Sequence, residues 1–182
     1  MTATLRDVKL LIVDRDGVVS RDPDGRTARA EDWRCMPGSA AAIARLVHGG
    51  WRVAMMADRG PLARGASDMS GLVSMHARLI DEIDLAGGRV DAVLFVPAPD
   101  APARTAEAAA SIEETLSRMQ AAPESTVVVA DRAADLDAAH AAGCRPMLVL
   151  SGHGRDTFCS ATLPPGTVVR VDLSAIAAEL AP

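Results

Sequence analysis

Short apolar runs alternate along this chain with longer stretches that carry helical spacing, and this alternation constrains the fold more than any other feature. Apolar runs that predict strands lie at Val8–Val13, Arg52–Met56, Val90–Val96, Thr126–Ala130 and Pro146–Leu150, with Thr167–Val171 as a candidate sixth. Between them, alanine-rich stretches predict helices over Ser39–His48, Leu62–Leu85, Ala103–Ala121 and Ala133–Ala142. Strands that are apolar on both faces and separated by helices are typical of a parallel sheet covered on both sides.

Proline and glycine residues fall where such a fold needs helices to begin and end. Pro37-Gly38-Ser39 precedes the first helical stretch, and Gly49-Gly50, Gly87-Gly88 and Gly143 follow three of the others. With 182 residues, the chain is long enough to bury one sizeable core, and its length favours one domain over two full domains. The sequence therefore predicts a single doubly wound, Rossmann-like α/β domain over residues 1–182, with helices on both faces of the sheet.

Charge and composition argue against several classes of protein. The formal net charge of −5, without a basic stripe, argues against nucleic-acid binding. The cysteines Cys35, Cys144 and Cys159 form no C-x-x-C pair, which argues against a disulfide framework or a structural zinc site. Apolar runs stay below the roughly 18 residues of a membrane-spanning helix, and charges interrupt the N-terminal one. We expect a cytoplasmic protein with no membrane partner and, with few aromatic residues, a monomer.

Acidic residues crowd the ends of the first and fourth predicted strands. Asp14 and Asp16 follow the first strand in the stretch KLLIVDRDGVV, and Asp131 and Asp135 follow the fourth. In doubly wound folds the ligand binds outside the carboxyl ends of the strands, where these side chains would meet. Carboxylates brought together repel one another unless a proton or a cation intervenes, and oxygen-rich sites suit Mg²⁺.

These motifs resemble the signature of the haloacid dehalogenase superfamily of phosphotransferases. Asp14-x-Asp16-Gly17 matches its first motif, and VVVADRAADLDAAHAAG matches its acidic fourth motif through Asp131 and Asp135. The chain is most similar to the small phosphatases that act on heptose bisphosphate and histidinol phosphate. DRDGVVS, Pro37-Gly38, Ala63-Arg64-Gly65 and LVLSGHG match these phosphatases over roughly residues 8–157. The resemblance implies the same α/β fold with no cap domain or a minimal one.

The resemblance also implies a mechanism and a set of site residues. Asp14 would attack phosphorus and form an aspartyl-phosphate, and Asp16 would protonate the leaving oxygen and later activate water. Mg²⁺ would be held by Asp14, the backbone carbonyl of Asp16 and Asp131, with Asp135 orienting the surrounding shell. Gly17 would let the chain turn tightly beside the phosphate. The expected substrate is a sugar phosphate or a similar small phosphorylated metabolite.

The sequence departs from the family pattern at three places. Relatives carry a Ser or Thr at the end of the second strand to hydrogen-bond the phosphoryl oxygen, where this chain has Met56 or Ala57. Relatives carry a Lys before the fourth strand, a role that Arg104 could fill because a guanidinium binds phosphate well. The zinc loop that many relatives carry is replaced by VPAPDAPARTAEAA, so we expect no zinc.

Two further arginines follow the second predicted strand. Arg59 and Arg64 could reach the phosphate of a bound substrate, and we name them as candidate substrate-binding residues. An alternative interpretation is a binding or regulatory module that keeps the metal site but lacks efficient turnover, which the missing hydroxyl and lysine favour. A phospho-accepting receiver domain would need a Lys after the fifth strand, where the chain has Ser151-Gly152, so we set that interpretation aside.

Overall fold

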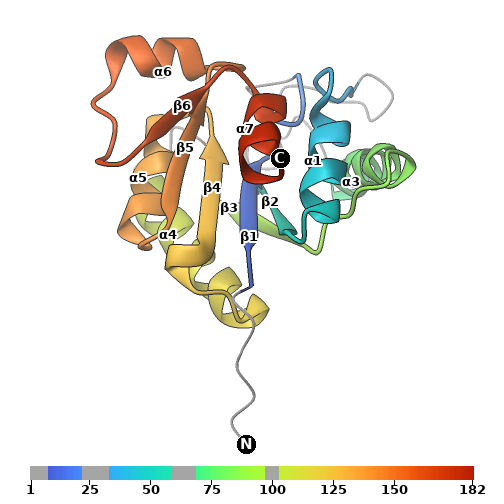
Figure 1. The fold of residues 1–182 in the computed structure, drawn as a ribbon, viewed down its shortest axis with the longest axis horizontal. Coiled ribbons are helices and arrows are strands. Elements are labelled where there is room, and N and C mark those ends of the chain that lie inside the picture. The colour runs from blue at the N-terminus through green and yellow to red at the C-terminus, as the bar shows by residue number, and fades with distance from the viewer. Residues whose placement is uncertain (1–7, 22–32, 59–68, 97–102) are drawn as a thin grey trace, which may run out of the picture.

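The computed structural model of the chain describes residues 8–21, 33–58, 69–96 and 103–182, and its elements alternate between strands and helices (Figure 1). The strands are β1 (Leu10–Asp14), β2 (Arg52–Asp58), β3 (Ala92–Val96), β4 (Thr126–Ala130), β5 (Arg145–Val149) and β6 (Val168–Arg170). The helices are α1 (Ser39–His48), α3 (Met69–Leu85), α4 (Arg104–Met119), the short η2 (Pro123–Ser125), α5 (Ala133–Ala141), α6 (Gly154–Ser160) and α7 (Leu173–Leu180).

The strands form one parallel sheet in the order β3-β2-β1-β4-β5-β6. β1 lies in the middle, with Leu11 opposite Val53 of β2 and opposite Val127 of β4. The chain order runs outward from β1 in one direction and then returns to β4 to run outward in the other. The ends of β1 and β4 therefore flank a topological switch point, where a doubly wound fold places its ligand. The predicted fold class is confirmed.

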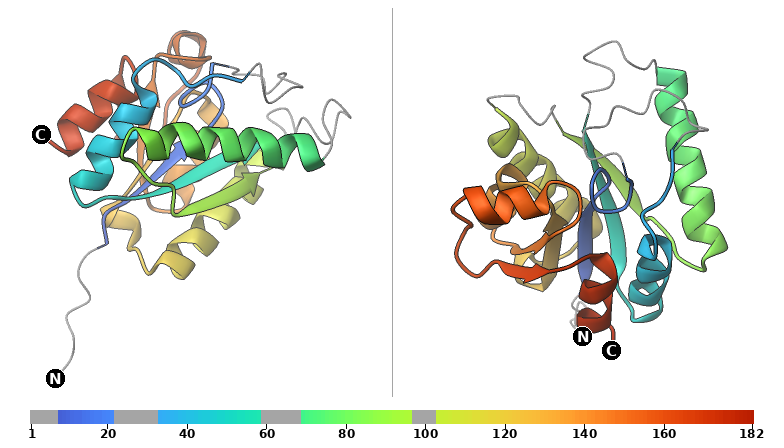
Figure 2. Two further views of the ribbon diagram at one scale, coloured as in Figure 1. Left: turned by 90° about the vertical axis from the view of Figure 1, so that its right-hand side faces the viewer. Right: turned by 90° about the horizontal axis from the view of Figure 1, so that it is seen from above.

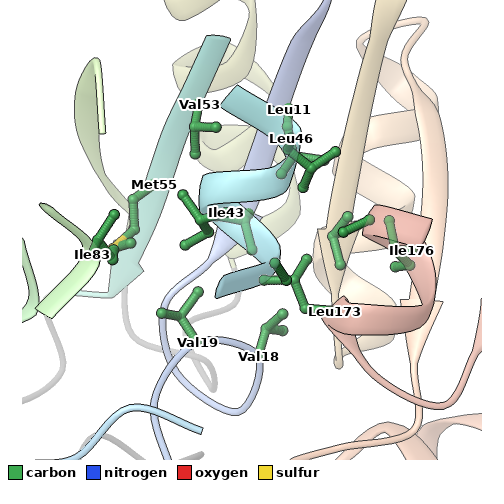
Figure 3. Packing of buried hydrophobic residues seen from close by; sticks show 14 of the residues in the cluster. Leu11, Val18, Val19, Ile43, Leu46, Val53, Met55, Ile83, Leu173 and Ile176 are labelled. Carbon is green, nitrogen blue, oxygen red and sulfur yellow. The ribbon is translucent and has the colours of Figure 1, made fainter. Parts of the chain in front are cut away.

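Helices cover both faces of this sheet, as the views in Figure 2 show. Because successive side chains of a strand point to opposite faces, Leu11 and Val13 join one core cluster while Leu10 and Ile12 join another. The first cluster packs against α1, α3 and α7, and the second against α4 and α5. Figure 3 shows the first cluster at close range. Both faces of β1 are thus buried, which explains its continuous apolar run.

The element boundaries match the sequence expectations closely in the core and less well at the C-terminal end. α1 has the predicted bounds Ser39–His48, and β4 has the predicted bounds Thr126–Ala130. The predictions missed α6 and α7, which are short helices of 7 and 8 residues. Residues 62–68 of the predicted third helix lie outside the described residues. The segments 22–32 and 59–68, on which the expectation of a minimal cap depends, lie outside them as well.

None of the helices within the described ranges is long and apolar enough to cross a bilayer.

Candidate active site

Asp14 is the last residue of β1, and the sheet itself fixes its position at the carboxyl edge. Its backbone lies opposite Met56 in the parallel register with β2, and the next amide, that of Arg15, donates to the Met56 carbonyl at 2.8 Å. The Asp14 side chain is 4% exposed. The carboxylate at the end of the central strand is therefore rigidly positioned and largely shielded from solvent, which suits a group that must approach a substrate atom accurately.

The turn after β1 brings Asp131 against the backbone of two glycines. Gly17 has a φ of 81° and Gly152 a φ of 56°, values that glycine adopts readily. A Cβ atom added to either glycine would lie 2.1 Å from Oδ2 of Asp131. The Ser151 hydroxyl donates to the Gly17 carbonyl at 2.8 Å and ties the two loops together. Glycine at both positions is therefore a condition for seating the Asp131 carboxylate between the loops.

Asp131 directly follows β4, is fully buried, and has its two carboxylate oxygens in different environments. Oδ2 accepts a hydrogen bond from the His153 backbone amide at 2.7 Å. Oδ1 is buried and has no hydrogen-bond partner among the described residues. Burial raises the pKa of Asp131 from its ordinary 3.8 to about 6, against the lowering effect of the His153 amide. A buried oxygen of this kind requires a partner that the protein does not supply, either a proton or a cation.

Asp14 is also placed where its negative charge is opposed. Burial raises its pKa well above the ordinary value, and the nearby carboxylates of Asp135, Asp131 and Asp16 raise it further. Arg104 acts in the opposite direction. Among the described residues, burial and the neighbouring acids thus outweigh the opposing effect of Arg104 on the pKa of Asp14.

Arg104 and Asp135 form a buried ion pair at one side of this group. Arg104 is the first residue of α4, and its Nε and Nη2 donate to the two oxygens of Asp135 at 3.0 and 2.9 Å. The two side chains are 3% and 0% exposed. The structure thus brings Arg104 into the site, as the sequence predicts. It also gives Asp135 a partner that the sequence reasoning did not assign to it, because both Asp135 oxygens face the guanidinium.

A second buried arginine, Arg15, pairs with Asp16. Its Nε donates to Oδ1 of Asp16 at 2.9 Å and its Nη2 to Oδ2 at 2.5 Å. The Ser20 hydroxyl also donates to Asp16, at 3.3 Å. The Arg15 Nη1 lies 3.0 Å from Nε2 of His76 on α3. Sequence reasoning missed both Arg15 and His76, although Arg15 stands between the two acids of the motif.

The end of β2 completes the site. Met56 packs in the core cluster under α4 and α5, and Ala57 is fully buried, so no hydroxyl occupies this edge of the strand. Asp58, which the site prediction did not include, is 4% exposed and interacts electrostatically with both Arg15 and Arg104. The predicted substrate-binding residues Arg59 and Arg64 lie outside the described residues.

The donor set fits a hard cation. Among the described residues, no three or more His, Cys, Asp and Glu side chains are grouped as a metal cluster. The predicted magnesium set differs from such a cluster because it combines the carboxylates of Asp14 and Asp131 with the backbone carbonyl of Asp16. Its donors are all oxygen, and Oδ1 of Asp131 has no other partner among the described residues. By contrast, a cavity of about 680 Å³ that Lys9, Arg45 and His48 help to line contains none of these residues.

Three comparisons with known proteins agree on one group. A HAD-hydrolase-like family model matches residues 106–175. The D-glycero-beta-D-manno-heptose-1,7-bisphosphate 7-phosphatase of Bordetella bronchiseptica is 37% identical over 175 residues, which cover 95% of this chain and 98% of that protein. The Pseudomonas aeruginosa phosphatase of the same name is 36% identical over 94% of this chain and 97% of that protein.

Solved structures give the same result. A crystal structure of the D,D-heptose 1,7-bisphosphate phosphatase from B. bronchiseptica, complexed with magnesium and phosphate, superposes with a TM-score of 0.88 at 36% identity. The match covers 95% of this chain and 98% of that one. The corresponding phosphatase from Burkholderia thailandensis gives a TM-score of 0.76, also at 36% identity, over 94% of this chain and 97% of that one.

Proposed function

Because the chain belongs to the heptose-1,7-bisphosphate 7-phosphatase family of HAD-type phosphatases, we propose that it hydrolyses a sugar phosphate through a magnesium-dependent aspartyl-phosphate mechanism. The relatives' names make a heptose 1,7-bisphosphate the first substrate to test. The observation that carries the proposal is the buried pair of Asp14 and Asp131, of which Asp131 keeps an oxygen that has no partner among the described residues. The pair therefore supports a site that is completed by a cation and an anionic substrate.

In this mechanism Asp14 is the nucleophile. A carboxylate oxygen of Asp14 attacks phosphorus, the bond between phosphorus and the sugar oxygen breaks, and Asp16 gives its proton to that leaving oxygen. Asp16 then takes a proton from water, whose oxygen attacks phosphorus and breaks the bond to Asp14. Inorganic phosphate leaves, and both aspartates return to their starting forms. The position of Asp14 at the end of β1 supports this role, because the strand and the β2 register fix its backbone.

The acids of the site would hold the metal ion. The carboxylates of Asp14 and Asp131 and the carbonyl of Asp16 are the proposed ligands, and Asp135 lies behind them, paired with Arg104. Bound Mg²⁺ supplies positive charge that favours ionised Asp14 and offsets the charge of the phosphate. The raised pKa of Asp14 supports this need, since in the metal-free protein its surroundings favour the protonated form, which is a poor nucleophile.

Arg104 takes the part that a lysine plays in relatives. Its guanidinium opposes the negative charge around Asp14, while Asp135 fixes its orientation through two hydrogen bonds. A guanidinium held in this way brings a permanent positive charge to the edge of the sheet where the phosphate would bind.

A second candidate function is a module that binds a metal and a phosphorylated ligand without efficient turnover. The observation that favours it is the buried, hydroxyl-free end of β2 at Met56 and Ala57. Loss of one hydrogen-bond donor to a developing charge lowers the rate by on the order of a hundredfold. Binding would survive such a loss better than catalysis does.

The test is phosphate release by the purified protein with and without Mg²⁺. The panel contains a heptose 1,7-bisphosphate, other sugar phosphates, nucleotides and p-nitrophenyl phosphate, with Asp14→Asn as the matched control. Magnesium-dependent release that disappears in Asp14→Asn is the expected result, and Arg104→Ala is then the next variant to measure. A folded protein that binds Mg²⁺ but releases no phosphate from any compound would overturn the phosphatase proposal in favour of the binding module.

A further inference from the structure

The Arg15 side chain is buried inside the site, and its hydrogen bonds within the described residues go to Asp16 and His76. It is 1% exposed, and its Nε and Nη2 both donate to Asp16. Its remaining terminal nitrogen, Nη1, is 3.0 Å from Nε2 of His76. Because Nε and Nη2 are bonded to Asp16 and Nη1 to His76, the planar guanidinium group is held on two edges. Rotation of the Arg15 side chain would break at least one of these hydrogen bonds.

His76 is the partner of Arg15 Nη1. It lies on α3, and its ring packs against Phe95 of β3 with the ring centroids 5.4 Å apart and the planes at 59°. Since Arg15 can only donate, Nε2 of His76 must accept, which requires the neutral ring with its proton on Nδ1. Burial and the Arg15 charge lower the pKa of His76 to about 4, so the ring is in this neutral form at ordinary pH.

We propose that His76 is a positioning residue: it fixes Arg15 from α3, and Arg15 in turn fixes the place of the Asp16 carboxyl group, which in its protonated form gives a proton to the leaving oxygen. The inference rests on the proposed function, in which Asp16 is the general acid. Within the described residues, His76 makes a hydrogen bond to Arg15 and none to Asp14, Asp16 or Asp131, so it would act on Asp16 through Arg15. It would be a second layer of support around the reacting groups, comparable to the groups that orient metal ligands.

The proposal makes a specific claim about which substrates depend on His76. A general acid accelerates the departure of a poor leaving group, such as a sugar alkoxide, much more than that of a good one, such as p-nitrophenolate. If His76 orients Asp16, its loss will slow hydrolysis of a sugar phosphate and spare the aryl phosphate. A residue that only stabilises the fold would lower both rates in proportion to the folded fraction.

The experiment compares His76→Phe, His76→Gln and His140→Phe with the wild-type protein. His76→Phe keeps an aromatic ring beside Phe95 but removes the acceptor, and His76→Gln restores an acceptor through its amide oxygen. His140 is an exposed residue of α5 and serves as the matched control. For His76→Phe we expect kcat on the sugar phosphate to fall about tenfold with KM unchanged, and kcat on p-nitrophenyl phosphate to stay within about twofold. His76→Gln is expected to recover most of the loss.

A second readout does not depend on turnover. The guanidinium N–H signals of Arg15, assigned by their loss in Arg15→Lys, are followed by ¹⁵N NMR. We expect the Nη1 protons to exchange with water at least about tenfold faster in His76→Phe than in the wild type, while His76→Gln remains slow. Unchanged exchange in folded His76→Phe, or equal losses of kcat on both substrates, would overturn the proposal. A wild-type protein without turnover would instead refute the proposed function, and the exchange rates would still decide whether His76 holds Arg15.

Discussion

Four acids at one edge of the sheet are treated in two different ways. Asp16 and Asp135 are each held by a buried arginine through two hydrogen bonds. Asp14 and Asp131 receive no such pairing in the described part of the chain, although burial raises the pKa of Asp135 as well as theirs. Among the described residues, Asp16 and Asp135 are thus each paired with an arginine, whereas Asp14 and Asp131 are not.

This difference separates acids that the fold itself neutralises from acids that need a further positive charge. A buried carboxylate that is paired with arginine is satisfied by the fold and contributes to its geometry, because breaking the pair leaves an isolated charge. A buried carboxylate without a partner destabilises the fold when it ionises, and it becomes favourable only when something positive binds. The arginines therefore fix the positions of Asp16 and Asp135, and the unpaired acids Asp14 and Asp131 make the site dependent on a cation. The predictions below test this division.

The largest expected effect is the loss of turnover when Asp14, one of the two unpaired acids, is replaced. Asp14→Asn removes the proposed nucleophile, so kcat should fall at least about a thousandfold. The same change should raise the stability of the metal-free protein at pH 7, since it replaces a carboxylate whose ionised form the fold disfavours. Phosphate release and urea unfolding measure the two effects. A variant that lost both activity and stability would show that Asp14 is a structural residue.

Removing the partner of an arginine-paired acid should have the opposite effect on stability and lower it. Arg104→Met leaves Asp135 buried without its partner and should lower the free energy of unfolding by about 3–5 kcal/mol. Arg118→Met is the matched control on the same helix, because Arg118 pairs with Glu114 while 77% exposed, and should cost less than about 0.5 kcal/mol. Urea unfolding of both variants gives the comparison. Equal, small losses would mean that the buried pair does not support the fold.

The central acids should also make stability depend on pH. The folded pKa of Asp131, about 6, lies above its ordinary 3.8, so between these values the folded protein binds more protons than the unfolded chain. Burial raises the pKa of Asp14 and Asp135 in the same direction. The metal-free protein should therefore lose stability as pH rises through this window. Urea unfolding of the metal-free protein from pH 4 to pH 8 measures this loss of stability. In Asp131→Asn, the free energy of unfolding is expected to depend less on pH. A free energy of unfolding that rises with pH in the metal-free wild-type protein would contradict the account.

The smallest expected effect concerns the missing hydroxyl. Met56 packs in the core, which leaves Ala57 as the position where a donor can be introduced at the end of β2. Ala57→Ser should raise kcat/KM for the sugar phosphate by about tenfold. This is less than the full effect on rate that one hydrogen-bond donor to a developing charge has in other enzymes. Steady-state kinetics measures the change, with Ala57→Val as the size control. No gain in a folded Ala57→Ser protein would show that this edge does not contact the phosphate.

Much of the fold could be predicted from the sequence because its signals are local. The apolar run of β1 and the helical spacing of α1 each depend on residues close in the chain, and the structure confirms both. α6 and α7 were missed since helices this short offer too few turns for a clear pattern. α7 is held by Leu173 and Ile176, which join the core cluster that includes α1. The grouping of Asp14 with Asp131 was predictable because parallel strands deliver their ends to one edge.

The contacts within the site could not be predicted in the same way. Arg104 and Asp135 are 31 residues apart, and Arg15 and His76 are 61 residues apart, so only the folded chain shows that they meet. Arg15 looked like an ordinary turn residue in the sequence, and nothing local distinguished His76 from the other histidines in helices. The loops that meet at Gly17 and Gly152 likewise owe their close approach to tertiary packing around Asp131.

The central claim is that Asp14 and Asp131 together need a cation, and a magnesium titration tests it most directly. Isothermal titration calorimetry at pH 7.5 compares the wild-type protein with Asp131→Asn, and thermal unfolding is recorded with and without Mg²⁺. The account predicts one site that stabilises the wild-type fold, with an affinity at least about a hundredfold weaker in Asp131→Asn. Equal binding by the two proteins, or no binding by the wild type, would contradict it.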